Sequence, residues 1–199
     1  LTGPSFVVTD RATLLQRLDE LMADQMPAQR SVVVLTAAID DLTEINADFG
    51  HEATDVILFA VQERLRGVMR RRDRLVRYSS NRFAIIMTGC PSDRIEIAAR
   101  RFVRAVSREA IETRHGIALV RIRIGAAHAP DLTRQSSELL SAAEGALNDA
   151  RRGPIETVTI ARAVAAAPTG SDHQQDHDAL AALNGRRVGL ALQPVVRAR

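Results

Sequence analysis

The segment 31–39 constrains the fold of this chain more than any other. It is an apolar run rich in valine, and such a run is typical of a central strand that is buried on both faces. Two further apolar stretches, 75–76 and 83–87, predict short strands. Ser79, Ser80 and Asn81 lie between them and are turn formers, so the sequence predicts a β-hairpin with a polar tip.

Apolar residues recur at helical spacing in five segments, at 14–22, 41–48, 56–68, 95–106 and 139–147. Thr9 or Asp10 can cap the first helix, because either side chain accepts a hydrogen bond from the first turn. The second helix ends at Gly50. The third is expected to close on 70–72, where arginines offset the negative end of the helix dipole. Its packed side is predicted to be Val56, Leu58, Phe59, Val61, Leu65 and Val68. The fourth helix opens at Pro91 and offers the core Ile95, Ile97, Ala98, Phe102 and Val106.

Alternating patterns predict two more strands. Between 117 and 127, apolar residues alternate with Arg121 and Arg123, which indicates a strand with one solvent-exposed face. A helix broken at Gly153-Pro154 separates it from a final alternating strand at 155–160. The order of elements predicts a single α+β or α/β domain in which helices pack on a sheet.

The composition limits the classes of protein to which the chain can belong. Its 199 residues suffice for one domain with a core and a linker, and 46% apolar with 26% charged residues is ordinary for a globular protein. No run approaches the roughly 20 apolar residues of a membrane span, and the lack of signal-peptide features predicts a cytoplasmic location. The single Cys90 excludes an internal disulfide and a cysteine metal cluster. A net charge of +3 with 3% aromatic residues argues against nucleic-acid binding.

The texture of the sequence changes from Ala161 onward. Residues 163–178 are rich in Ala, Pro, Gly, Ser, Gln, His and Asp, which indicates a linker. His173 and His177 have the i, i+4 spacing of a metal-binding pair, but without ordered carboxylate or cysteine ligands a solvated linker is the better interpretation. A short helix and then a strand are predicted within 179–199.

Three groups of residues carry a resemblance to a known family. They are Ala37-Ala38-Ile39-Asp40-Asp41-Leu42-Thr43-Glu44-Ile45-Asn46, then Phe49-Gly50-His51 with Asp55, then Arg77-Tyr78-Ser79-Ser80-Asn81-Arg82-Phe83. In order and spacing they resemble the GGDEF domain of diguanylate cyclases over roughly 5–160, with the signature hairpin rewritten as Ser-Ser-Asn-Arg-Phe. The resemblance implies an α+β fold with a central, mostly antiparallel sheet flanked by helices. In the family the domain binds GTP and two domains face each other to make cyclic di-GMP, so the resemblance allows a homodimer but leaves the oligomeric state open.

A second resemblance lies near the end of the chain. Residues 190–196, with the pair Gln193-Pro194, resemble the first strand of an EAL phosphodiesterase domain. Together the two resemblances imply a degenerate GGDEF domain at 1–162, a linker at 163–178 and the start of a truncated EAL domain at 179–199. The EAL domain is then the expected intramolecular partner.

The resemblance implies that the metal site of the family has been lost. Cyclases hold divalent metal with acidic side chains, because the metal neutralises charge on the transferring phosphoryl group. The two metal-ligand positions align with Ala38 and Asn81, and the following acidic position of the signature is Arg82. Asp40 and Asp41 remain beside the site, but they do not recreate the lost ligand. We therefore expect no bound Mg²⁺.

The phosphate contacts of the family are also replaced. The signature glycines, which let phosphates approach the backbone closely, align with Ser79 and Ser80, and Phe83 is the last position of the rewritten signature. A lysine and an arginine that hold phosphates from the last helix align with Ala150 and Pro154. We expect no catalytic residues and no cyclase activity.

Asn46 and Asp55 align with the amide and carboxylate that recognise guanine in the family. This would make GTP a weak ligand, because the phosphates would lack anchors. The alternative interpretation is structural: Asn46 braces the turn at 48–51 and Asp55 caps the long helix. The structural roles are favoured.

The motif Arg70-x-x-Asp73 keeps the spacing of the family's inhibitory site, five residues before the signature, and Arg101 aligns with its third member. Guanidinium groups bind phosphate or the outer edge of guanine, and a carboxylate accepts from guanine N–H groups. These three residues predict a cyclic di-GMP site that needs no metal. The alternative is an exposed i, i+3 pair at a helix end without any ligand.

These observations leave three functional hypotheses. The first is a catalytically inactive GGDEF domain that regulates an attached EAL domain and senses cyclic di-GMP. The second is a structural or dimerisation module that binds no nucleotide. The third is a domain that senses GTP through Asn46 and Asp55 without turnover.

Overall fold

The computed structural model describes residues 9–25, 28, 30–40 and 42–162. The expected linker at 163–178, the His173 and His177 pair and the expected EAL strand within 179–199 lie outside these residues. Among the described helices, none combines the length and the apolar content needed to cross a membrane.

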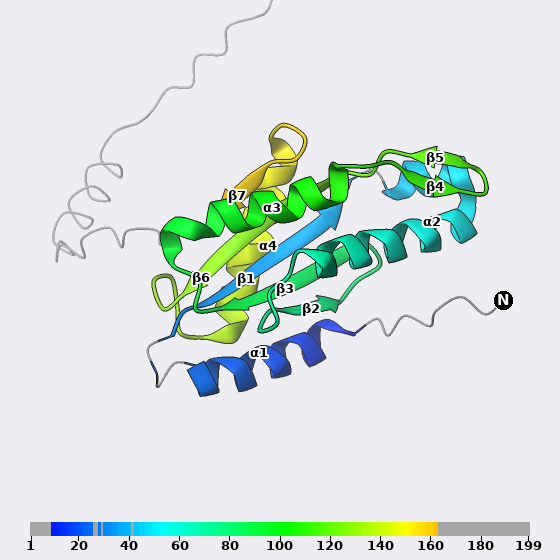
Figure 1. Cartoon of the computed structure of the whole chain (residues 1–199). Coiled ribbons are helices and arrows are strands. Elements are labelled where there is room, and N and C mark those ends of the chain that lie inside the picture. Colours follow the sequence, from blue (N-terminus) through cyan, green and yellow to red (C-terminus); the bar gives the residue numbers. More distant parts are fainter. Residues whose placement is uncertain (1–8, 26–27, 29, 41, 163–199) are drawn as a thin grey trace, which may run out of the picture. The chain divides into compact units, whose positions relative to one another are not determined.

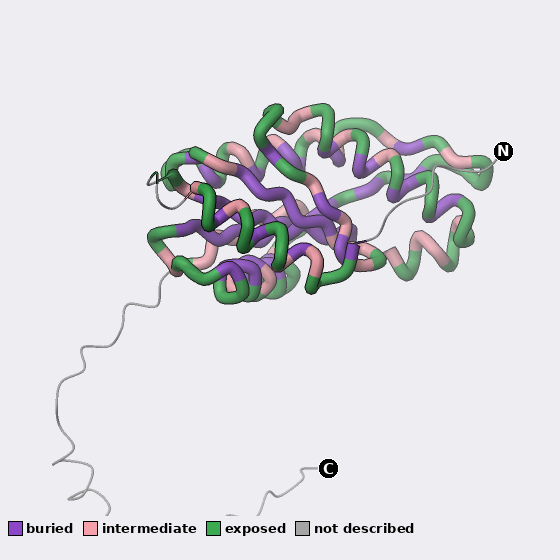
Figure 2. The backbone as a smooth tube through the Cα atoms, turned by 90° about the horizontal axis from the view of Figure 1, so that it is seen from below, coloured by how far each residue is buried: buried purple, intermediate pink, exposed green. Residues whose placement is uncertain are grey.

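A five-stranded sheet forms the middle of the domain, with the strand order β2-β3-β1-β6-β7 (Figure 1). Strand β1 (Val32–Ile39) is antiparallel to β3 (Arg82–Thr88) and to β6 (Ile122–Ala129). Strand β2 (Arg74–Arg77) is antiparallel to β3, whereas β7 (Val158–Ile160) runs parallel to β6. The expected mostly antiparallel sheet is therefore confirmed. Every residue of β1 is buried, as its apolar sequence predicts (Figure 2).

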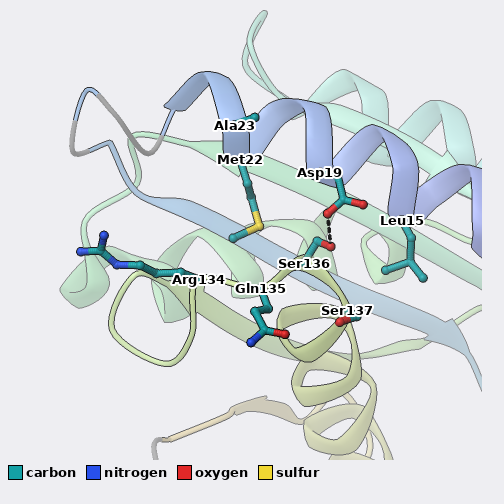
Figure 3. Close-up of a pocket in the computed structure, with 8 residues that line it drawn as sticks. All are labelled: Leu15, Asp19, Met22, Ala23, Arg134, Gln135, Ser136 and Ser137. Atoms are coloured by element: carbon teal, nitrogen blue, oxygen red, sulfur yellow. Dashed lines mark hydrogen bonds between the residues drawn. The ribbon is translucent and has the colours of Figure 1, made fainter.

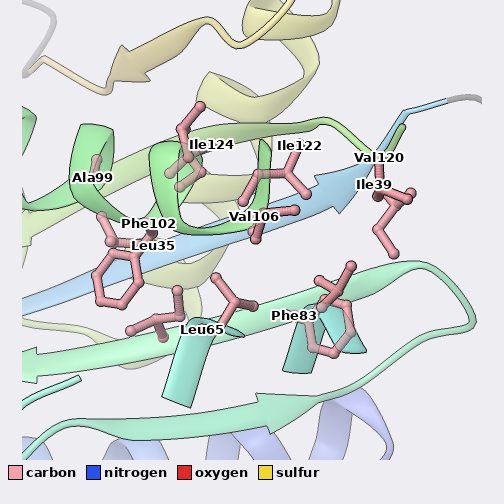
Figure 4. Close-up of a cluster of buried hydrophobic side chains, with 14 of the residues drawn as sticks. Leu35, Ile39, Leu65, Phe83, Ala99, Phe102, Val106, Val120, Ile122 and Ile124 are labelled. Atoms are coloured by element: carbon pink, nitrogen blue, oxygen red, sulfur yellow. The ribbon is translucent and has the colours of Figure 1, made fainter. Parts of the chain in front are cut away.

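Helices cover both faces of this sheet. On one face, α2 (Leu42–Gly67) and α3 (Ile95–Ser107) pack on the odd-numbered side chains of β1, and Leu65, Phe83 and Phe102 meet there (Figure 4). We call this the α2–α3 core. On the other face, α1 (Arg11–Gln25) and α4 (Ser136–Arg152) pack on even-numbered residues of β1 and form the α1–α4 core. Because successive side chains of a strand point to opposite faces of the sheet, those of β1 pack against two separate layers of helices.

Local sequence signals set several helix boundaries. Asp10 caps α1, because its Oδ1 accepts a hydrogen bond of 2.7 Å from the Thr13 N–H. The two predicted helical segments meet at Gly50, where the backbone leaves the helical conformation (φ 77°, ψ 171°), so α2 consists of two helices joined at a kink, as expected. A residue without Cβ adopts this positive φ at little cost. Gly153 follows the end of α4, as expected.

Some sequence-based expectations about the helices are wrong. Val56 and Phe59 on α2 are 43% and 39% exposed, and Ile97 on α3 is 59% exposed. These helices carry apolar residues on more than one face, so spacing alone did not identify the side that meets the sheet. Helix α2 also ends at Gly67, before the arginines at 70–72, which lie in a turn that leads into β2.

The strand expected at 117–127 is divided in the structure. Its first part pairs as β5 (Gly116–Ala118) with the unexpected strand β4 (Ile111–Thr113) in a separate hairpin near α2. Strand β6 starts at Ile122 and is buried along most of its length, whereas the sequence predicted one solvent-exposed face. A short 3₁₀ turn, η1 (Ser92–Arg94), precedes α3.

Candidate functional site

The tip of the β2–β3 hairpin lies over the end of β1. The Ile39 N–H donates to the Asn81 carbonyl at 3.2 Å, and the Tyr78 N–H donates to the Arg82 carbonyl at 3.2 Å. Arg77 stabilises the tip, because its guanidinium donates to the carbonyls of Ser79 (3.3 Å) and Ser80 (2.8 Å). The rewritten signature therefore forms an ordered turn that is tied to the central strand.

A pocket of about 390 Å³ separates this hairpin tip from α2. Its lining is mostly polar and consists of Leu42, Thr43, Asn46, His51, Thr54, Leu58, Arg77, Ser80 and Asn81. Asn46 lines the pocket, and its Oδ1 accepts from the Thr54 hydroxyl at 3.3 Å, which also contacts the Gly50 carbonyl at 3.0 Å. Thr54 thus links Asn46 to the kink of α2.

Asp55 is not part of the pocket lining, but it acts on a residue that is. Burial lowers the pKa of the Arg77 guanidinium, and the Asp55 carboxylate opposes this shift. Arg77 is thus associated with both residues: it shares the pocket lining with Asn46 and is affected by the charge of Asp55. Arg77 and Thr54 are the members of this region that sequence reasoning missed, since neither belongs to an alternating or helical apolar pattern.

Ala38 lies between two arginines in the sheet. Its register partners are Arg82 on β3 and Arg123 on β6, and residues directly opposite each other in antiparallel strands share one face. Arg123 forms an ion pair of 2.8 Å with Asp40, whose side chain is 6% exposed, and its Nε donates to the Pro154 carbonyl at 3.4 Å. Asp41 lies outside the described residues.

Tyr78 occupies the opposite side of the hairpin, within the α1–α4 core. Burial and, to a smaller extent, the nearby Glu144 carboxylate raise the pKa of Tyr78 to about 12, while Arg82 opposes the shift. Glu144 in turn pairs with Arg11 at 3.1 Å. Arg82 therefore takes part in a charged group that joins the hairpin to α4 and α1.

A second cluster surrounds the turn before β2. The Oδ2 of Asp73, a buried residue, accepts from the Arg70 N–H at 2.8 Å, and the Asp73 N–H donates to the Arg70 carbonyl at 3.0 Å. Burial raises the pKa of the Cys90 thiol, and the next largest effects on it come from Arg70, Asp73 and Arg101. The charges of Arg70, Asp73 and Arg101 thus all act on Cys90, as does that of Asp93, so the three residues of the predicted cyclic di-GMP site lie in one neighbourhood.

Arg101 is held in an unusual state within this cluster. Its Nε is buried and has no hydrogen-bond partner among the described residues. Its guanidinium carbon lies 5.5 Å from the centre of the Phe102 ring. A buried N–H group without a partner is costly, so a ligand that accepts from it would gain binding free energy there.

A larger hollow lies between α1 and the start of α4 (Figure 3). Its volume is about 810 Å³, and it is open to solvent. Asp19 on α1 accepts a hydrogen bond from the Ser136 hydroxyl there, so the one carboxylate of the lining is occupied (Figure 3). No residue of the predicted sites reaches this hollow, and we assign it no chemistry.

Comparisons with known proteins agree with the resemblance seen in the sequence. The family model "Diguanylate cyclase, GGDEF domain" matches residues 7–155. The bifunctional diguanylate cyclase/cyclic di-GMP phosphodiesterase MucR of Pseudomonas aeruginosa is 25% identical over 189 residues, which is 95% of this chain and 27% of MucR. The chain therefore spans about a quarter of the length of this curated relative.

Two solved structures show how closely the fold is shared. The GGDEF domain of PA1120 (TpbB or YfiN) from P. aeruginosa has a TM-score of 0.73 at 25% identity, and the match covers 78% of this chain and 91% of that one. The GGDEF domain of DgcB from Caulobacter crescentus, solved in complex with c-di-GMP, has a TM-score of 0.70 at 19% identity, with 81% and 97% covered. The second likeness concerns the fold alone.

Proposed function

The chain belongs to the GGDEF family, and on that premise we propose that it is a catalytically inactive GGDEF domain that acts as a regulatory module in cyclic di-GMP signalling. It binds cyclic di-GMP through Arg70, Asp73 and Arg101 and controls an attached EAL domain. The similarity to MucR, a relative that combines cyclase and phosphodiesterase activities in its name, supports the EAL partner.

The observation that carries the loss of catalysis is the position of Ala38 between Arg82 and Arg123. Hard divalent cations need anionic or carbonyl oxygen ligands. The Ala38 side chain offers no oxygen ligand, and the two guanidinium groups beside it repel a cation electrostatically. The Asp40 Oδ1 is already paired with the Arg123 Nη1 at 2.8 Å. The residues present therefore do not fit a divalent cation, and the proposed function includes none.

The hairpin supports the same conclusion through the phosphate contacts. Side chains at Ser79 and Ser80 occupy space that glycines leave open for phosphate. Their carbonyls accept from Arg77, which turns that guanidinium toward the tip rather than toward a ligand. A triphosphate would therefore lose the close approach to the backbone that the glycines allow.

The regulatory site is supported by the cluster around Cys90. The guanidinium groups of Arg70 and Arg101 and the carboxylates of Asp73 and Asp93 all act on this thiol. Arg101 also keeps a buried Nε without a partner among the described residues. Arginine matches phosphate and guanine acceptors with paired donors. One carboxylate oxygen of Asp73 already accepts a hydrogen bond from the Arg70 N–H, so the first role of Asp73 is to hold the turn. In the proposed site Arg70 and Arg101 carry the main contacts with the ligand, and Asp73 contributes its other carboxylate oxygen.

The test is a calorimetric titration of cyclic di-GMP into this chain, with the variants Arg70→Ala and Arg101→Ala. We expect micromolar or tighter binding, about −8 kcal/mol or better, that weakens at least tenfold in each variant. Arg104→Ala, an exposed arginine on α3, is the matched control and should bind normally. Asp73→Ala is unsuitable, because it removes the hydrogen bond that holds the turn.

Cys90 provides an independent readout of the same site. It is the only thiol in the chain and is 3% exposed, so a thiol reagent should react slowly. Bound cyclic di-GMP should slow the reaction further, and Arg101→Ala should abolish this protection. An absence of heat and of protection would reject the binding site and favour a structural or dimerisation module.

Cyclase activity is tested separately with GTP and either magnesium or manganese. We expect no cyclic di-GMP, even at high domain concentration, where a homodimer would form. Product formation that is lost on Asp40→Asn would overturn the proposed inactivity.

The pocket beside the hairpin supports a second candidate, GTP sensing without turnover. It retains Asn46, has a volume of about 390 Å³ and is polar. GTP binding that weakens in Asp55→Ala but not in Arg101→Ala would favour this function. Equal GTP binding by the parent chain and Asp55→Ala would exclude it.

A further inference from the structure

A strongly basic pocket lies at the end of α1, beside the turn that leads into β2. Its volume is about 750 Å³, and it is lined by Leu21, Asp24, Gln25, Arg30, Arg71, Arg72, Arg74, Thr88 and Gly89. Four arginines from two segments that are distant in sequence therefore meet around one hollow. We call it the arginine pocket. Neither the GGDEF resemblance nor the proposed function uses these arginines.

The arginine pocket and the cluster around Cys90 flank the same turn but share no residue. Leu21 and α1 pack against the α1–α4 core, whereas Cys90 and Phe102 belong to the α2–α3 core. Arg70 acts on Cys90 on one side, while Arg71 and Arg72 line the pocket on the other. The two sites are thus separate.

The charge of the arginine pocket is not balanced within the described part of the chain. Eight arginines elsewhere form ion pairs with carboxylates. None of the four pocket arginines has such a pair among the described residues. Asp24 is the one acidic residue of the lining, and it accepts a hydrogen bond from the neighbouring Gln25 side chain. The pocket therefore concentrates positive charge that a ligand can neutralise.

The turn that presents these arginines is held in place before any ligand binds. The Asp73 carboxylate accepts from the Arg70 N–H at 2.8 Å. The Arg74 Nη1 donates to the carbonyls of Arg71 at 3.3 Å and Asp73 at 3.2 Å. Binding then has little backbone ordering to offset, which favours affinity. An exposed group of arginines on a mobile loop would lack this advantage.

We propose that the arginine pocket binds a polyphosphate chain directly, without a metal ion. Guanidinium groups pair with phosphate oxygens through two parallel N–H donors, so several of them suit a chain of linked phosphates. The pocket volume lies in the range of ligand sites that hold a nucleotide-sized molecule. Asp24 repels an anion at one wall and so directs the phosphates toward Arg30, Arg71 and Arg72. A nucleoside triphosphate and free inorganic polyphosphate share this chemistry.

The probe is inorganic tripolyphosphate, titrated calorimetrically into the full chain with EDTA present to remove divalent cations. The variants are Arg71→Gln with Arg72→Gln, and separately Arg30→Gln. All three positions are exposed, so the fold should persist. The matched control is Arg104→Gln with Arg108→Gln, two exposed arginines on and just after α3 that lie outside the pocket.

We expect micromolar binding at 25 mM salt that weakens at least tenfold in both pocket variants and stays within twofold in the control. Raising the salt to 200 mM should weaken binding severalfold, because added ions screen the charges. Equal binding of ATP, GTP and tripolyphosphate supports recognition of the phosphates alone. Tighter binding of one nucleoside triphosphate supports a nucleotide as the source of the chain.

Two results would overturn the proposal. One is binding weaker than millimolar at low salt. The other is an equal loss in the control variant, which would mean that net charge rather than this pocket attracts the anion. Cyclic di-GMP titration of the same variants separates the two sites, since Arg71→Gln with Arg72→Gln should leave the Arg70 and Arg101 site working.

Discussion

Helix α4 approaches the sheet closely at Gly125 on β6. A Cβ atom at this position would lie 2.1 Å from the Leu147 nitrogen and 2.2 Å from the Ala143 carbonyl oxygen. The Thr36 hydroxyl donates to that same carbonyl at 2.9 Å, which fixes the helix from the neighbouring strand. Because both obstructing atoms belong to the α4 backbone, no side-chain rotation relieves the contact.

The Gly125→Ala substitution should therefore push α4 away from the sheet. Non-bonded atoms need about 3.5 Å, so the helix would have to retreat by roughly 1.4 Å. A gap of that size forfeits more than half of the dispersion energy at the contacts that it opens between α4 and the sheet. Leu139, Leu140 and Leu147 are fully buried. We expect a loss of about 3 kcal/mol, against a typical total stability of roughly 5–15 kcal/mol.

Urea denaturation followed by circular dichroism measures this loss. With a slope of about 2 kcal/mol per molar urea, the midpoint should fall by about 1.5 M. The matched control is Gly145→Ala on the exposed side of α4, where a Cβ meets nothing within 4 Å. The free energy of unfolding of the control should rise by up to about 1 kcal/mol, because alanine has a higher helix propensity than glycine. A Gly125→Ala variant as stable as the parent would refute the close approach.

Three further perturbations follow from single contacts. Arg123→Met leaves the buried Asp40 carboxylate without its 2.8 Å partner and should cost about 3 kcal/mol of unfolding free energy. Adding Asp40→Asn should recover at least half of that cost, and simple additivity in a double-mutant cycle would contradict the pairing. The single tyrosine, Tyr78, should titrate near pH 12 in absorbance at 295 nm, because burial first and Glu144 second raise its pKa. Its native pKa exceeds the unfolded value of about 10, so stability should fall as the pH rises from about 10 to 12; an unchanged fall in Tyr78→Phe would count against this. Arg64→Met removes a guanidinium that donates to three carbonyls at the end of α3 and should cost about 2 kcal/mol in urea denaturation. Arg64→Lys should restore only part of this stability, because one ammonium group cannot reach all three carbonyls. Full restoration by lysine would contradict the role given to the guanidinium.

Much of the fold follows from local sequence patterns. The apolar run of β1 and the turn residues after β2 predict the central strand and the hairpin, because each signal is complete within a few residues. The β4–β5 hairpin was missed, since strands of three residues show no usable alternation. The exposure of Val56, Phe59 and Ile97 was also missed. A helix with apolar residues on several faces does not reveal which face meets the sheet until its neighbours are known.

The candidate sites depend more on contacts between distant residues. Asn46 and the hairpin tip follow from motif and spacing. The bond between Arg123 and Asp40 spans 83 positions, and no local pattern predicts it. Sequence reasoning assigned Arg123 to a solvent-exposed face, whereas burial of β6 forces its charge to find a partner. The role of Cys90 as the centre of the Arg70, Asp73 and Arg101 cluster likewise emerges only when β3 and α3 are packed together.

The two arginines beside Ala38 explain how the site tolerates the proposed loss of its metal. A buried carboxylate such as Asp40 is stable only when a positive charge or several donors compensate it. In a cyclase, a divalent ion adds positive charge to this corner. Here Arg123 supplies it from the neighbouring strand and, through the Pro154 carbonyl, also ties β6 to the loop after α4. On the proposed function, a fixed guanidinium from Arg123 therefore compensates Asp40 in place of an exchangeable ion. This exchange would add a permanent structural contact and remove the chemistry of the ion.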